Sequence, residues 1–147
     1  MPHLSVSRSR LIRRPLGEVF RLVRRFENWP RWSPWLVAAP GFELEFEENA
    51  YSWKGEACGH GRMEIVGEVP EHLICGELTL WKPHRTRAEV TFTFREMEGG
   101  TEVTWSLESK IPFFMFCFKG WMQRMIGADY ERGLRMLQDL AEEGIVR

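Results

Sequence analysis

The feature that most constrains the fold is a series of segments with alternating apolar and polar residues, followed by one long segment with helical spacing. The alternation is regular in residues 88–95 and 102–108, and Gly99-Gly100 between them has the composition of a tight hairpin turn. Residues 42–46 alternate in the same way, with glutamate at every second position. Consecutive strands joined by short turns predict an antiparallel sheet with one apolar face.

The C-terminal third has the spacing of a helix from residue 112 to Glu143. Its apolar stripe consists of Met122, Ile126, Tyr130, Gly133, Leu137, Leu140 and Ala141. A sheet with one apolar face needs a cover, and this is the only predicted helix long enough to supply it. We therefore predict one α+β domain over residues 1–147, in which a curved antiparallel sheet of about seven strands wraps around a long C-terminal helix.

The N-terminal part predicts a strand and one or two short helices. Alternation over Leu4–Ile12 indicates the strand, and Pro15 begins a short amphipathic helix. Residues 26–35 contain two prolines and three tryptophans, which favours a short helix or turn that packs rings. Trp29, Trp32 and Trp35 would form either the mouth of a pocket or a ring cluster that seals one end of the core, and we favour the seal.

Charge and cysteine content narrow the class of protein. The net charge is −1, which argues against general affinity for nucleic acid. Three widely spaced cysteines (Cys58, Cys75 and Cys117) without a CxxC motif fit free thiols in a reducing cytoplasm. The first residues lack the apolar core of a secretory signal, and the longest apolar run, 111–118, is too short to cross a bilayer. We expect a cytoplasmic protein without a transmembrane segment.

Several short segments, taken in order, match a known family pattern. They are Ile12–Pro15 with Glu18–Phe20, Trp32–Trp35, Trp53–Gly55, Gly59–Met63, Gly100–Trp105 and Met125–Leu134. Together they span nearly the whole chain, and their order resembles the START-like (SRPBCC, helix-grip) superfamily and its polyketide cyclase/dehydrase-type branch. The resemblance implies a cavity between the sheet and the last helix. It implies less about function, because one fold hosts many activities.

The residues that we predict to line this cavity lie on the inferred inner faces of the strands and the last helix. They are Trp53, Phe92, Phe94, Trp105, Met122, Ile126 and Tyr130. A completely filled core is the alternative, because large rings also pack against one another. Glycine at Gly55 and Gly133 leaves space, and methionine side chains adapt to different ligands.

No catalytic constellation stands out. Cys58 and His60 supply only two potential metal ligands where zinc needs three or four, so we expect neither a metal nor a cofactor. Ring closure and loss of water would need an acid or base in a dry pocket. The candidates are Tyr51, His60, Arg62, Glu77, His84, Arg85, Asp129 and Tyr130. We predict that Glu77 faces outward, with Ile74 and Leu78 facing the interior.

We therefore expect a protein that binds or transports a small hydrophobic molecule, either a lipid or an aromatic, polyketide-like metabolite. One alternative is an enzyme of the polyketide cyclase/dehydrase type. Another is an interaction or regulatory domain without a ligand, supported by the arginine-rich N-terminal segment and by Phe113, Phe114 and Phe116. Those three rings would form an exposed apolar patch, a contact in a homodimer, or part of the pocket lining.

Overall fold

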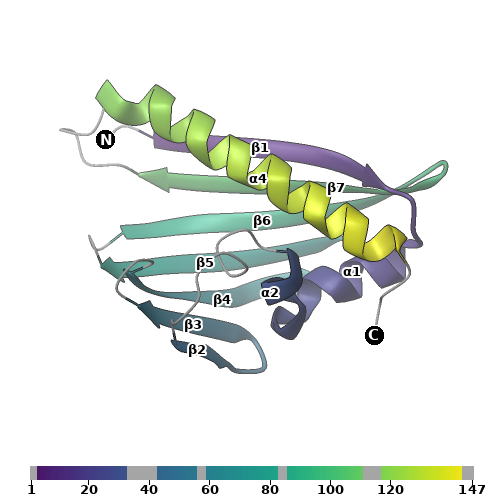
Figure 1. The fold of residues 1–147 in the computed structure, drawn as a ribbon, viewed down its shortest axis with the longest axis horizontal. Helices are drawn as coiled ribbons and strands as arrows, with labels where there is room; N and C mark the ends of the chain where they lie inside the picture. Colours follow the sequence, from purple (N-terminus) through teal and green to yellow (C-terminus); the bar gives the residue numbers. More distant parts are fainter. Residues whose placement is uncertain (1–2, 33–42, 56–58, 83–85, 111–116, 144–147) are drawn as a thin grey trace.

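The computed structural model describes residues 3–32, 43–55, 59–82, 86–110 and 117–143. Seven strands form one antiparallel sheet in the order β1-β7-β6-β5-β4-β3-β2 (Figure 1). The strands are β1 (His3–Ile12), β2 (Glu43–Phe46), β3 (Ala50–Gly55), β4 (Gly59–Val69), β5 (Leu73–Lys82), β6 (Thr86–Met97) and β7 (Gly100–Lys110). From β2 to β7 each strand pairs with its neighbour in the chain, and β1 closes the order beside β7, as the alternation predicts.

The helices lie on one side of this sheet (Figure 1). They are α1 (Leu16–Arg24), the 3-10 turn η1 (Phe26–Asn28), α2 (Trp29–Trp32) and α4 (Lys119–Glu142). Helix α4 crosses the sheet beside β1 and β7, and it contacts β1, α1 and α2. The predicted α+β arrangement, with a sheet wrapped around a long C-terminal helix and short helices after the first strand, is confirmed.

Helix α4 is shorter than predicted. It begins at Lys119 with Phe118 as its N-cap, whereas the apolar spacing predicts a beginning at residue 112. In residues 111–118 every position is apolar apart from a cysteine and a proline, so the run satisfies a helical spacing without being specific for it. Residues 112–116 lie outside the described residues. From Lys119 onward the helix continues through Gly120 and Gly127 without interruption.

A row of polar contacts fastens α4 along β1. Gln123 Nε2 donates to the Ser5 carbonyl at 3.0 Å, and Arg8 Nε donates to Glu131 Oε1 at 2.9 Å. Further along, the side chain of Gln138 contacts both Arg10 and the Leu11 carbonyl. Arg8 reaches Glu131 across Gly127, where a Cβ would lie 2.3 Å from its guanidinium Nη2. The helix is therefore held in a defined position at the β1 edge of the sheet.

Strand β4 is the irregular strand of the sheet. Its pairing with β5 shifts register between His60 and Gly61 and again between Ile65 and Gly67. Such bulges bend a strand and increase its twist, as expected from the glycines in this segment. This curvature lets the sheet wrap partly around the helices on one of its sides (Figure 1).

Candidate ligand-binding site

A stack of aromatic rings joins the sheet to α4 at the centre of the molecule. The ring of Tyr130 on α4 lies parallel to that of Trp105 on β7, with centroids 3.8 Å apart and planes 8° apart. The Phe92 ring of β6 is also stacked with that of Trp105, with centroids 5.1 Å apart. Phe92 and Trp105 are direct cross-strand neighbours, so the regular register of β6 and β7 fixes this arrangement.

Two tryptophans from the short N-terminal helices complete this ring cluster. Trp29 and Trp32 are buried, at 4% and 0% exposure, and the Trp32 centroid lies 5.5 Å from that of Trp105. Trp29 also contacts Phe26 and Tyr51, and its Nε1 donates to the Val23 carbonyl at 2.8 Å. We name Trp29, Trp32, Tyr51, Phe92, Trp105 and Tyr130 the ring cluster. Trp35, the third tryptophan of this segment, lies outside the described residues.

The seven residues predicted to line the cavity divide into two groups. Phe92, Phe94, Trp105 and Tyr130 are buried in the core, and Trp53, Met122 and Ile126 are half-buried against it. The structure thus brings all seven into one apolar core or against its edge. Their role as cavity lining stays a prediction.

The half-buried group lies at the end of the molecule where α4 begins. Leu78 shares a cross-strand row with Ala88, Ser109 and Leu4, and Trp53 lies nearer still to this end of the sheet. Gln123, whose side chain bonds to Ser5, places the first turns of α4 over the same row. Inward-facing apolar side chains therefore retain solvent contact at this end, which makes it the candidate opening to the interior.

Trp53 owes its position to a glycine on the neighbouring strand. Trp53 and Gly61 are paired between β3 and β4, and a Cβ at Gly61 would lie 2.4 Å from Cζ2 of the Trp53 ring. The ring therefore lies flat over a position that only glycine leaves open. It also contacts the Tyr51 ring, with centroids 5.6 Å apart.

Beside the indole N–H groups of Trp29 and Trp105, the ring cluster contains the polar groups of Trp32, Tyr51 and Tyr130. The Trp32 Nε1 is buried and has no hydrogen-bond partner among the residues that the structure describes. Burial raises the pKa of the Tyr51 phenol above its ordinary value. Burial, and then the proximity of Tyr51, raises the pKa of Tyr130. Both phenols are therefore protonated at neutral pH and can donate hydrogen bonds.

The remaining acid–base candidates lie on the surface. Glu77 faces outward as predicted and forms an ion pair with Arg87 at 2.6 Å. Arg62 is paired with Glu47 and Glu64, and the hydrogen bond that its guanidinium donates to Glu47 raises the pKa of Arg62. His60 packs beside Trp81, and Asp129 pairs with Arg132 at 3.3 Å. His84 and Arg85 lie outside the described residues.

Sequence reasoning placed Trp32 in a seal and left it out of the lining. The spacing of Trp29 and Trp32, three residues apart, was the available signal, since such residues share one face of a helix. That face is turned to the centre of the molecule, so Trp32 contacts Phe92 and Trp105, two of the predicted lining residues.

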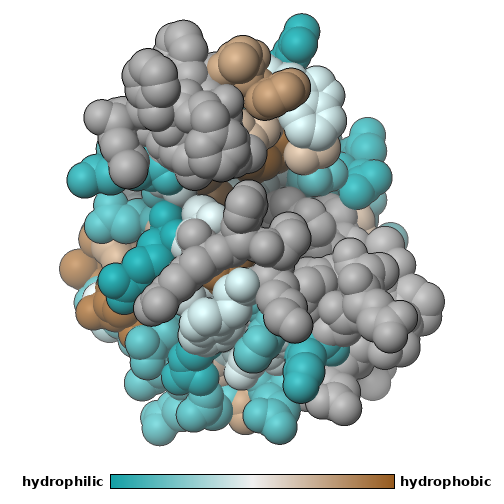
Figure 2. All heavy atoms as spheres, turned by 90° about the vertical axis from the view of Figure 1, so that its left-hand side faces the viewer, coloured by the Kyte–Doolittle hydropathy of each residue, from teal (hydrophilic) through white to brown (hydrophobic). Residues whose placement is uncertain are grey.

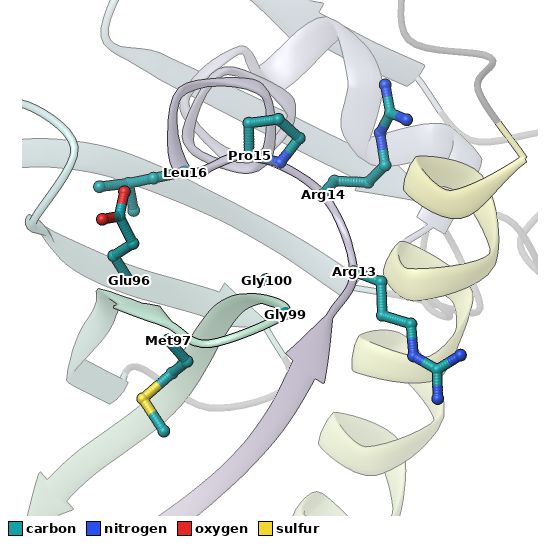
Figure 3. A pocket seen from close by; sticks show the side chains of 8 residues that line it. All are labelled: Arg13, Arg14, Pro15, Leu16, Glu96, Met97, Gly99 and Gly100. Atoms are coloured by element: carbon teal, nitrogen blue, oxygen red, sulfur yellow. The ribbon is translucent and has the colours of Figure 1, made fainter.

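A hollow of about 340 Å³ lies elsewhere, between the β6–β7 turn and the start of α1. Leu16, Glu96 and Met97 line this hollow, and Figure 3 shows that the side chains of Arg13 and Arg14 point away from it. Arg14 pairs instead with Glu18 at 2.7 Å. Because its arginines are directed elsewhere, this hollow offers no concentrated charge to a ligand.

Neither a metal-ligand cluster nor a helix able to span a membrane is found among the described residues. No group of three or more His, Cys, Asp or Glu side chains is arranged to hold a metal ion there, and Cys58 is not among those residues. No helix in the described part of the chain combines the length and apolarity that a membrane span requires.

Solved structures share this fold at low sequence identity. The di-domain ARO/CYC StfQ from the steffimycin biosynthetic pathway has a TM-score of 0.74 and 13% identity, over 97% of this chain and 52% of that chain. For DynU16, from the dynemicin biosynthetic locus, the values are 0.69 and 13%, over 97% and 49%. Protein MLL2253 from Mesorhizobium loti gives 0.71 and 16%, over 95% and 97%. The chain thus spans about half the length of StfQ and DynU16.

The sequence itself matches a family model over residues 3–142, which is nearly its whole length. No curated protein matches it. This match agrees with the helix-grip topology of the sheet and α4. The chain belongs to the family described as polyketide cyclase / dehydrase and lipid transport.

Proposed function

We propose that this protein binds a small apolar molecule that carries a hydrogen-bond acceptor, such as a carbonyl group, between the sheet and α4. The observation that carries the proposal is the Trp32 Nε1, a buried donor without a partner among the described residues. An unsatisfied buried donor costs about 1–3 kcal/mol, so it calls for an explanation. A ligand acceptor that hydrogen-bonds to this N–H would remove this free-energy cost and add a hydrogen bond shielded from water.

The surroundings of Trp32 define the rest of the ligand. Aromatic faces from Phe92, Trp105 and Tyr130 suit a flat apolar or aromatic body. Trp53, Met122 and Ile126 would contact the part of the ligand nearest the opening, since they retain partial exposure. Both the lipid and the polyketide-like metabolite named by the family fit this description.

Binding is favoured over catalysis by the two phenols. A general acid works best when its pKa lies near the operating pH, and burial moves the pKa values of Tyr51 and Tyr130 in the opposite direction. As permanent donors they would orient a ligand oxygen rather than transfer a proton. The cyclase/dehydrase alternative would need a different acid or base in the interior.

The test compares two probes of the same shape, 2-acetylnaphthalene with a carbonyl acceptor and 2-ethylnaphthalene without one. Calorimetry should show that the wild-type protein prefers the acetyl compound, and Trp32→Phe should reduce this preference roughly tenfold. Trp29→Phe is the matched control, because the Trp29 Nε1 already donates to Val23. Equal affinities for both probes in the wild type would contradict the acceptor requirement.

Native mass spectrometry of the purified protein addresses the natural ligand. We expect a co-purified apolar molecule, or a thermal shift with members of a panel of lipids and aromatic ketones. If neither a bound species nor a thermal shift is found across the panel, the binding function itself is wrong.

A further inference from the structure

Large apolar side chains are exposed on the first turns of α4. Phe118 and Trp121 are both 57% exposed, and Met125 is 45% exposed. Their spacing of three and four residues puts them on one side of the helix. Single exposed apolar residues are ordinary on protein surfaces, but three on one side of a helix form an apolar patch whose exposure to water is unfavourable. We name Phe118, Trp121 and Met125 the apolar stripe.

The charge around the apolar stripe has one sign. Residues 109–128 contain three cations, Lys110, Lys119 and Arg124, and no aspartate or glutamate. None of the three cations forms an ion pair with a described residue. The first turn of α4 also lacks an acidic residue, although a helix N-terminus favours negative charge. Among the described residues, no ion pair or helix-terminus interaction explains why these positive charges gather here.

The apolar stripe is carried by a firmly attached part of the helix. The bonds from Gln123 to Ser5 and from Arg8 to Glu131 hold this part of α4 against β1. Figure 2 faces this end of the molecule and shows apolar surface gathered at its upper edge, over the beginning of α4. The exposure is therefore a property of the folded state.

We infer that this end of α4 docks the protein on a membrane surface containing anionic lipid. Tryptophan favours the interface between headgroups and acyl chains, and phenylalanine and methionine beside it would enter the same layer. Lys110, Lys119 and Arg124 would meet the lipid phosphates. A two-fold contact with a second copy fits less well, because it would bring the same three cations of each copy together. This inference goes beyond the proposed function and does not depend on it.

Vesicle sedimentation of the full chain tests the inference. We expect binding to vesicles of phosphatidylcholine with phosphatidylglycerol, and much weaker binding to phosphatidylcholine alone or at high salt. Trp121→Ala should weaken binding roughly tenfold, and Lys119→Gln and Arg124→Gln roughly fivefold each. Trp81→Ala, at a 39% exposed tryptophan on β5, and Arg135→Gln, farther along α4, are controls that should bind like the wild type.

Three results would overturn the inference. The first is no sedimentation of the wild type with the anionic vesicles, and the second is equal binding by the wild type and Trp121→Ala. The third is a dimer in solution that Trp121→Ala converts to monomer while no vesicle binding is seen, which would assign the apolar stripe to a second copy. Naphthalene-probe binding is measured on the same samples, so failure here is distinguished from failure of the interior site.

Discussion

At the scale of single residues, the position of Trp53 depends on the space that Gly61 leaves for its ring. We predict that Gly61→Ala lowers the free energy of unfolding by about 1–3 kcal/mol, because the new methyl group overlaps a rigid indole ring. It should also displace Trp53 and weaken binding of the acetyl probe. Chemical denaturation and calorimetry of the variant provide both measurements.

Gly67→Ala is the matched control for this prediction. Gly67 lies on the same strand, and a Cβ there would meet no atom within 4 Å. Its stability and probe affinity should equal those of the wild type. Equal behaviour of the two alanine variants would show that Trp53 moves away at no cost and that its position is unimportant.

The sequence predicted residue positions well where a regular strand decides them. The inward side of Phe92, Phe94 and Trp105 and the outward side of Glu77 follow from alternation alone. The contact between Trp32 and Trp105 does not, since it joins residues far apart in the chain through a helix of only four residues. Only tertiary packing decides where so short a helix lies.

At the scale of elements, the register of the sheet creates an acidic row on its outer face. Glu64 pairs with Glu77, Glu77 with Glu89, and Glu89 with Glu108, across β4, β5, β6 and β7. Arginines pair with Glu64 and Glu77, whereas Glu89 and Glu108 form no ion pair with a described residue. Like charges directly opposite each other destabilise a sheet.

We predict that Glu89→Thr raises the free energy of unfolding by about 0.2–1 kcal/mol at low salt, and that the gain shrinks at high salt. Glu102→Thr is the control, because Glu102 lies opposite Arg95 and not opposite another acid. Urea denaturation at two salt concentrations measures both variants. If Glu89→Thr is less stable than the wild type at low salt, repulsion within the acidic row does not destabilise the sheet and the prediction is wrong.

The elements themselves were predictable because their patterns are long. Alternation over whole strands and a stripe that persists over most of α4 each average out local exceptions. The beginning of α4 was not predictable, since the uniformly apolar residues before Phe118 match any periodicity. The bulges in β4 were indicated by its glycines, but their positions depend on pairing with β5.

At the scale of the whole molecule, the fold fastens α4 at one edge and leaves apolar side chains accessible at one end. Polar contacts run along β1 from Gln123 to Gln138, while the ring cluster lies at the centre. The half-buried Trp53 and Ile126 and the exposed apolar stripe lie at the end where α4 begins. An apolar molecule leaving a lipid surface would therefore reach the interior without crossing the rest of the protein.

We propose that the Trp32 N–H, which has no hydrogen-bond partner among the described residues, donates to an acceptor on the ligand. Nuclear magnetic resonance of the tryptophan indole N–H groups tests it most directly, with the Trp32 signal assigned from Trp32→Phe. We predict that 2-acetylnaphthalene moves this proton signal downfield, as a new hydrogen bond requires, while 2-ethylnaphthalene does not. A Trp32 signal that stays in place at saturating acetyl probe would contradict the claim.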